Sequence, residues 1–147
     1  MYKHILVPID GSRLGAKALG HAYRLAQAVG ARVTVFYASP DYPVRMMEDS
    51  LVYQPLSRAE YARLRGKEAD GILEPAARKG DEFGIAAKTA HELAAAPWQA
   101  ILAAAKKLKC DAIVMASHGR GGMGSLLLGS ETQKVLAHSR LPVLVVR

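Results

Sequence analysis

Short apolar runs alternate along this 147-residue chain with longer stretches in which apolar residues recur every three or four positions. Such runs are typical of strands buried on both faces, and the three- and four-residue spacing is typical of helices with one buried face. We therefore expect strands at 4–9, 32–38, 85–92, 111–116 and 142–146, the weak run 85–92 being an edge strand. We expect helices at 13–29, 57–79, 97–108 and 131–139.

Local signals predict where several of these elements begin and end. Gly30 stands where a helix that ends in a left-handed residue favours glycine, and Ser57 and Glu60 have the spacing of a capping box. Pro75 interrupts the helical pattern that follows, where we expect a kink and not a stop. Residues 39–55 are rich in proline and mixed in polarity, so they are expected to form a long loop.

Strands that are separated by helices of this length imply right-handed crossovers and a mostly parallel, open sheet. The chain is predicted to form one α/β domain over residues 1–147, since no linker or repeat divides it. Ligands of such sheets bind beyond the carboxyl ends of the strands, where the strand order reverses. If the first strand is central, the loops 8–12 and 117–130 meet at that point.

The composition of the chain limits the kinds of binding partner that we expect for it. The formal net charge is +7, but the basic residues are scattered and are not interleaved with aromatic residues, so we expect no nucleic-acid partner. No apolar run reaches the ~18 residues that span a bilayer, and the N-terminus resembles no export signal. We therefore expect no membrane association and a cytoplasmic location. One cysteine, Cys110, excludes an internal disulfide framework.

Residues 116–132 form a glycine-rich segment after the fourth predicted strand, and two familiar templates fail on it. Three of its glycines satisfy the dinucleotide spacing G-x-G-x-x-G, yet no helix opens at once and no acidic residue for a ribose lies ~20 residues further on. A Walker-type loop fails because no Lys-Ser or Lys-Thr pair follows the glycines. What remains is Gly119, nine residues, and Gly129-Ser130 at the start of a helix.

This remaining pattern has the composition of a phosphate site. Glycine lets backbone N–H groups approach an anion, and the N-terminus of the following helix adds free N–H groups and partial positive charge. Ser130 can offer its hydroxyl to a phosphate oxygen. A capping box of Ser130 with Gln133 is the competing interpretation, and both can hold at once.

Further stretches make the chain resemble the universal stress proteins over essentially its whole length. They are Ile-Leu-Val-Pro-Ile-Asp-Gly-Ser at 5–12, Asp-Ala-Ile-Val-Met-Ala-Ser-His-Gly-Arg at 111–120, Leu-Leu-Gly-Ser at 127–130 and Leu-Pro-Val-Leu-Val-Val at 141–146. The resemblance implies a Rossmann-like fold of the adenine nucleotide alpha hydrolase type, with five parallel strands in the order 3-2-1-4-5. It also implies ATP binding, since the family's ATP-binding branch carries a glycine, two residues, a glycine, nine residues, and Gly-Ser or Gly-Thr. Here the first of these glycines is Ala116.

Site residues follow from the resemblance position by position. Pro8, Asp10 and Gly11 would flank the nucleoside, with Asp10 toward the ribose hydroxyls. Backbone groups near residues 37 and 38 would meet the adenine edge, and the loop and the next helix would hold the phosphates with Mg²⁺. The expected nucleotide site is Pro8, Asp10, Gly11, Tyr37, Ala38, Ala116, Gly119, Arg120, Gly129, Ser130, Glu131 and Thr132, with no protein side chain as a metal ligand.

Several of these residues have a second interpretation. Asp10 could cap the first helix instead, and Arg120 could be an ordinary exposed arginine instead of a phosphate partner. Glu131 favours the helix dipole but repels an anionic ligand unless its side chain points away. His118 has no evident carboxylate or nucleophile partner, so no catalytic residue is expected. Ala116 costs nothing if its φ is negative.

The favoured hypothesis is a cytoplasmic, ATP-binding stress-response protein that acts as a nucleotide-responsive regulator. The apolar terminal strand 142–146 predicts a homodimer, because an apolar edge strand is usually paired or covered, and the resemblance implies the same pairing. Two alternatives stay open. One is an interaction module of the family's branch that does not bind ATP, to which Ala116 points. The other is a hydrolase with slow ATP turnover at most.

Overall fold

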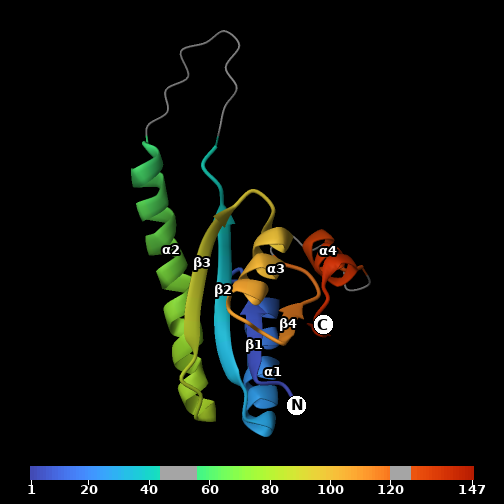
Figure 1. Ribbon diagram of the computed structural model, residues 1–147. Helices are drawn as coiled ribbons and strands as arrows, with labels where there is room; N and C mark the ends of the chain where they lie inside the picture. The colour runs from blue at the N-terminus through green and yellow to red at the C-terminus, as the bar shows by residue number, and fades with distance from the viewer. Residues whose placement is uncertain (44–55, 120–126) are drawn as a thin grey trace.

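The computed structural model describes residues 1–43, 56–119 and 127–147. Strands and helices alternate along the chain (Figure 1): β1 His4–Pro8, α1 Arg13–Val29, β2 Arg32–Pro40, α2 Arg58–Arg78, the 3₁₀ turn η1 Lys79–Phe83, β3 Lys88–Ala94, α3 Pro97–Lys107, β4 Ala112–Ala116, α4 Ser130–His138 and β5 Val143–Val146. The strands form one sheet in the order β3-β2-β1-β4-β5, and every neighbouring pair is parallel. The predicted α/β fold and strand order are confirmed.

Helices cover both faces of the sheet, and the central strand β1 shows why its sequence is continuously apolar. Ile5 and Val7 belong to the core that α1 and α2 close, whereas Leu6 packs with residues of α3 and α4 on the other face. All three side chains are fully buried. Successive side chains of a strand point to opposite faces, so a strand covered on both sides needs an apolar residue at every position. No helix in the described ranges is both long and apolar enough to cross a membrane.

The first two helices begin or end on the signals that the sequence predicts. Gly30 has a φ of 70°, and its N–H donates to the carbonyl of Ala26 at the end of α1. The capping box of α2 is formed: the Glu60 N–H donates to Ser57 Oγ at 3.2 Å, and the Ser57 N–H donates to a Glu60 carboxylate oxygen at 2.8 Å. The helix continues through Pro75, as expected, before the chain tightens into η1.

The largest differences from the sequence prediction concern the paired strands β2 and β3. β3 begins at Lys88 and not at residue 85, because the N–H of Ile85 donates to the Gly80 carbonyl at 2.9 Å and so closes the preceding turn. β3 then extends to Ala94, and β2 reaches Pro40 because these two residues are partners in the ladder. The start of the predicted loop 39–55 is therefore strand, and residues 44–55 lie outside the described ranges. β3 is an edge strand, as predicted.

Candidate functional site

A cleft of about 830 Å³ opens at the carboxyl ends of the strands, beyond the last residue of the central strand β1. This is the position predicted from the strand order, and the volume is usual for a small-molecule site. The residues of the predicted site that line the cleft are Pro8, Asp10, Tyr37, Ala38, Ala116, Gly119, Gly129, Ser130, Glu131 and Thr132. Gly11 is not among the lining residues, and Arg120 lies outside the described residues.

The loops after β1 and β4 touch at Asp10 and Gly119, as the central position of β1 predicts. Asp10 Oδ1 accepts a hydrogen bond from the Ser12 N–H at 2.9 Å. Asp10 Oδ2 lies so close to Gly119 that a Cβ at this position would overlap it. Glycine at 119 is therefore required by the contact between the two loops, whether or not a ligand is present.

The helix cap that one interpretation gave to Asp10 belongs to Ser12. The N-cap of α1 is Ser12, whose Oγ accepts a hydrogen bond from the Gly15 N–H at 3.0 Å. Gly11, with a φ of 79°, makes the turn between the strand and this cap, a conformation that glycine adopts without strain. The capping interpretation of Asp10 is wrong, and Gly11 shapes the loop from outside the cleft.

α4 begins with free backbone donors beside the cleft. Its N-cap is Gly129, which has no side chain to accept a hydrogen bond, and Ser130 is the first helical residue. The first backbone hydrogen bond of the helix joins the Gln133 N–H to the Gly129 carbonyl at 3.0 Å. Within residues 1–43, 56–119 and 127–147, the N–H groups of residues 130–132 have no acceptor. An anion can take that place, favoured by the positive end of the helix dipole.

The predicted capping box of Ser130 and Gln133 does not form. α4 begins at Ser130, one residue earlier than predicted, and the Gly129 N–H donates to the Ser117 carbonyl at 2.7 Å. The Gln133 side chain donates instead to the Leu128 carbonyl at 2.6 Å. The Ser130 hydroxyl thus has no partner in the described part of the chain, and it lines the cleft.

The Thr132 hydroxyl holds the first turn of α4 against the end of β4. It donates to the Ala116 carbonyl at 3.0 Å, and the residue is only 3% exposed. A contribution of Thr132 to an anion site is therefore left to its backbone N–H. Ala116 has an ordinary backbone conformation, because Lys109 is the one described non-glycine residue with a positive φ. Alanine stands here without strain, as expected.

The Glu131 carboxylate is directed to α3. One of its oxygens accepts a hydrogen bond from the Trp98 N–H at 2.8 Å, and the other lies 3.7 Å from Lys134 Nζ. The N-cap of α3 is Ala96, which makes no side-chain hydrogen bond, so Glu131 supplies the cap from the neighbouring helix. This placement and pairing reduce the repulsion that Glu131 would exert on an anion in the cleft.

The other end of the cleft presents backbone groups of β2. Pro8, the last residue of β1, pairs with Phe36, and the Ile9 N–H donates to the Phe36 carbonyl at 2.9 Å. Backbone groups alternate between the two sides of a strand, so the N–H and C=O of Ala38 point to the side of that carbonyl, past the end of β1. Ala38 therefore offers one donor and one acceptor at an open strand edge.

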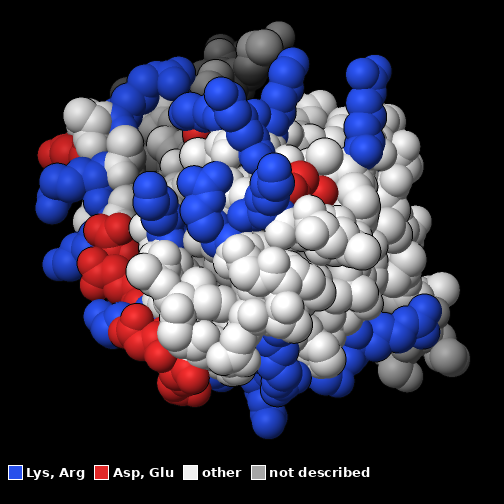
Figure 2. All heavy atoms as spheres, turned by 60° about the horizontal axis from the view of Figure 1, so that its bottom comes forward, with Lys and Arg blue, Asp and Glu red and all other residues white. Residues whose placement is uncertain are grey.

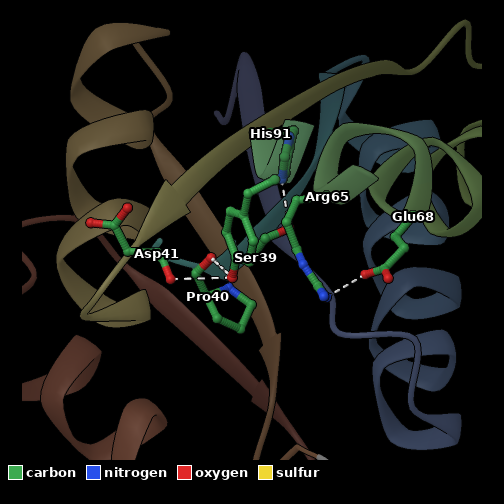
Figure 3. Close-up of polar contacts among 7 residues, drawn as sticks. Ser39, Pro40, Asp41, Arg65, Glu68 and His91 are labelled. Carbon is green, nitrogen blue, oxygen red and sulfur yellow. Dashed lines mark hydrogen bonds and ion pairs between the residues drawn. The ribbon is translucent and has the colours of Figure 1, made fainter. Parts of the chain in front are cut away.

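Contacts with β3 and α2 fix this extension of β2 in place (Figure 3). Ser39 Oγ and His91 Nε2 are hydrogen-bonded at 2.7 Å and join β2 to β3. Tyr61 of α2 donates its hydroxyl to the Pro40 carbonyl at 3.0 Å, and the Arg65 guanidinium lies 5.1 Å from the centre of the Tyr61 ring. The backbone that faces the cleft at Ala38 is thus held from the opposite side.

Sequence reasoning missed much of the cleft wall. The additional lining residues are Ile9, Gly15, Phe36, Pro40, Pro97, Ile101, Met115 and His118. Ile9 and Met115 directly adjoin predicted site residues, which was a usable signal. Pro97 and Ile101 come from α3, which no sequence motif connects with the loops, so only the packing of the helix brings them there.

The electrostatics of the cleft depend on backbone dipoles. Its described lining includes the carboxylates of Asp10 and Glu131 and no lysine or arginine. His118 Nδ1 is 3.1 Å from Ser117 Oγ, and Ser117 is only 5% exposed, so this hydroxyl is not an accessible nucleophile. The described groups therefore suit the binding of an anion by N–H donors better than acid–base chemistry.

The family model of the universal stress proteins matches residues 1–147. A Thermus aquaticus relative, the universal stress protein in the QAH/OAS sulfhydrylase 3′ region, is 37% identical over 150 residues, which cover all of both chains. The solved structure of MJ0577, a universal stress protein of Methanocaldococcus jannaschii, is similar with a TM-score of 0.80 and 26% identity, covering 99% of this chain and 96% of that one. A universal stress protein solved in complex with cAMP is similar with a TM-score of 0.70 and 26% identity, covering 99% and 97%. The chain therefore belongs to the universal stress protein family.

Proposed function

We propose that this protein binds an adenine nucleotide, ATP first of all, in the cleft, and acts as a nucleotide-responsive regulator in the cytoplasm through its single domain. The observation that carries the proposal is that one cleft of about 830 Å³ contains both the free N–H groups that open α4 and the open backbone edge of Ala38. The related universal stress protein in complex with cAMP supports it, since a member of the family there holds an adenine nucleotide.

In this proposal the two ends of the cleft take different parts of the nucleotide. Phosphate oxygens accept hydrogen bonds from the N–H groups of residues 130–132 and from the Ser130 hydroxyl, which need an acceptor. The donor and acceptor of Ala38 meet the polar edge of adenine, and Pro8 and Pro40 supply apolar contact nearby. Asp10 meets the ribose hydroxyls.

Mg²⁺ would enter with the phosphates. Among the described residues, no group of three or more His, Cys, Asp or Glu side chains could hold a metal ion. Mg²⁺ keeps several water ligands and commonly binds through substrate phosphates, so a protein cage is not required. We therefore expect Mg²⁺ to alter the affinity for ATP more than the affinity for AMP.

Two measurements on purified protein test the proposal. The protein is first denatured by heat, and the supernatant is chromatographed to identify any nucleotide carried through purification. Calorimetric titrations with ATP, AMP and cAMP, each with and without Mg²⁺, then give the ligand preference. Empty protein that also gives no heat of binding at millimolar ATP would exclude a nucleotide function.

A dimeric interaction module without nucleotide binding is the second candidate, and Ala116, where the family's ATP-binding branch has glycine, points to it. β5 is an edge strand, and its Leu144 is 46% exposed. An apolar edge strand is usually paired or covered, so we infer a homodimer through Val143–Val146 for either function. Replacing Ala116 with glycine separates the candidates: ATP binding that appears only in the glycine variant would favour the interaction module.

A further inference from the structure

A second hollow lies at the opposite ends of α3 and α4. It measures about 600 Å³ and is lined by Leu102, Ala105, Lys106, Lys109, Cys110, His138, Ser139, Arg140 and Leu141. The linings of the hollow and of the cleft share no residue: α3 contributes Pro97 and Ile101 to the cleft, and Leu102, Ala105 and Lys106 to the hollow. The hollow is therefore a separate feature from the proposed nucleotide site.

The hollow combines an apolar floor with a cationic rim. Leu102 and Leu141 pack against the core on this face of the sheet, and Lys106, Lys109 and Arg140 are exposed residues of the lining. Figure 2 views the molecule with the bottom of Figure 1 turned forward. On the face that it shows, several Lys and Arg lie close together in the upper part, and most Asp and Glu lie along the left flank. The surroundings of the hollow therefore favour negative charge.

The cations of the rim have no carboxylate partner among the residues that the structure describes. Within the described ranges, Lys106, Lys109 and Arg140 form no ion pair, whereas Lys107, which does not line the hollow, lies 3.5 Å from a Glu92 oxygen. The carboxylate next along the chain, Asp111, accepts hydrogen bonds from the N–H groups of residues 3 and 4 at 2.8 and 3.0 Å. It is therefore directed to the backbone of β1.

Helix capping does not account for the three cations. Lysines near a helix C-terminus often stabilise its exposed carbonyls. Here the N–H groups of Cys110 and Ser139 donate to the carbonyls of Ala105 and Val135 at 2.8 Å, so these two carbonyls have backbone partners. Among the described residues, the side chains of Lys106, Lys109 and Arg140 donate no hydrogen bond to a helix carbonyl.

We propose that this hollow is a second binding site, independent of the nucleotide cleft, for a small amphiphilic anion: a carboxylate or phosphate head on an apolar body. The three cations bind the head through charge-assisted hydrogen bonds, and the apolar floor receives the body, which removes apolar surface from water. A bare anion would contact only the three cations, and a neutral hydrocarbon would contact only the apolar floor. A volume of about 600 Å³ matches a small molecule.

The sequence provides a reporter for this site. Cys110 is the one cysteine of the chain, lines the hollow and is 7% exposed. A ligand in the hollow would shield it, so the rate at which a thiol reagent modifies it measures occupancy. Burial raises the pKa of the thiol to about 11, so the assay is run at alkaline pH to provide enough thiolate.

Four probes are titrated in the absence of nucleotide: octanoate, octyl phosphate, octan-1-ol and acetate. At each concentration we measure the rate at which a disulfide reagent modifies Cys110. We expect the two amphiphilic anions to slow modification at millimolar concentration, and octan-1-ol and acetate to leave the rate nearly unchanged. The double variant Lys106→Gln/Arg140→Gln should need about tenfold more octanoate for the same protection. Lys107→Gln, the matched control outside the hollow, should behave like the unmodified protein.

Three results would overturn the proposal. Octanoate and octyl phosphate could give no protection at 10 mM, octan-1-ol could protect equally well, or the double variant could match Lys107→Gln. Circular dichroism shows whether each variant is folded, and all the substituted side chains are exposed. Because no nucleotide is present, the outcome is read in the same way whether or not the cleft binds ATP.

Discussion

At the scale of single residues, the glycines near α4 are required by the packing of the loops themselves. A Cβ at Gly129 would lie 3.0 Å from the Cα of His118, and one at Gly119 would overlap the Asp10 carboxylate. A larger residue at either position would move the loop with or without a nucleotide. Loss of binding after such a substitution would therefore not show where the phosphates lie, whereas removal of a single hydroxyl would.

Replacing Ser130 with alanine should weaken ATP binding about tenfold, because a hydrogen bond to a charged phosphate is lost. The helix should remain intact, since Gly129 is its N-cap and the Ser130 hydroxyl has no partner in the described residues. Calorimetric titration measures the dissociation constant. Gln133→Ala is the control, because that side chain bonds to the Leu128 carbonyl and is not part of the lining. Equal affinities for the two variants would contradict a phosphate contact at Ser130.

The sequence predicted these residues more reliably than it predicted their partners. Ten of the predicted positions line the cleft. Gly119, Gly129 and Ser130 could be predicted because their spacing after a strand indicates backbone that packs closely, and the other positions followed from the family resemblance. The partner of Thr132 is a carbonyl 16 residues away, and that of Glu131 is an N–H 33 residues away. Such pairs arise from the packing of α4 against β4 and α3, which leaves no spacing to recognise.

At the scale of elements, the start of α3 contacts both ends of α4. Glu131 of α4 caps the Trp98 N–H at the start of α3, and the Trp98 ring stacks on His138 at the end of α4 with 4.6 Å between ring centres. The cap of α2 could be predicted because Ser57 and Glu60 are close in sequence. The cap of α3 could not, because the accepting group belongs to another helix.

Glu131→Gln should change stability and ligand affinity in opposite directions. The loss of negative charge at the N-termini of two helices should lower the free energy of unfolding by about 0.5–1 kcal/mol. The same change should increase ATP affinity several-fold at low salt, because it removes a carboxylate beside the phosphates. Urea denaturation and calorimetry measure the two effects. Glu92→Gln is the control, because the Glu92 carboxylate also pairs with a lysine but lies outside the cleft. Equal effects of the two variants on ATP affinity would refute the placement of Glu131 beside the phosphates.

His4 joins three elements and should make stability depend on pH. Its ring nitrogens contact the Leu108 carbonyl at 3.1 Å and Thr34 Oγ1 at 2.8 Å. Burial lowers the pKa of His4, and the charge of Arg32 lowers it further. The unfolded chain therefore takes up a proton first as the pH falls through about 6.5, and stability decreases until the pH is below the folded-state pKa.

Urea midpoints between pH 7.5 and 5 test this prediction. The unmodified protein should lose stability across the interval, and His4→Gln, which cannot titrate, should lose less. The comparison concerns the slope with pH, so a general destabilisation of the variant does not affect it. A slope that is the same in both proteins would show that other groups cause the pH dependence.

At the scale of the whole molecule, the strand order places β1 in the middle and leaves β3 and β5 as edges. This arrangement was predictable, because alternating strands and helices restrict the topology and the family resemblance selects one order. The extent of the cleft was not, since it depends on how far β2 continues past β1. That length is decided by the pairing of β2 with β3 up to Pro40 and Ala94.

Leu144→Lys should convert the proposed homodimer into a monomer, because it places a charge on the exposed apolar edge of β5. Sedimentation velocity at micromolar concentration measures the change. Leu136→Lys is the matched control: Leu136 is also a large exposed apolar residue, at 40% exposure, but it belongs to α4. Dissociation by both variants, or by neither, would exclude pairing through this strand.

The uncapped start of α4 links the lifetime of the protein to its surroundings. A solute that accepts hydrogen bonds from the N–H groups of residues 130–132 binds the folded chain. The free energy of unfolding therefore rises with the concentration of that solute. A ligand present at 100 times its dissociation constant adds about 2.7 kcal/mol to stability. Cells that make the same amount of this chain but differ in nucleotide supply would then degrade it at different rates. Proteolysis at graded ATP concentrations, with cleavage mapped beyond Gly129, would measure that dependence.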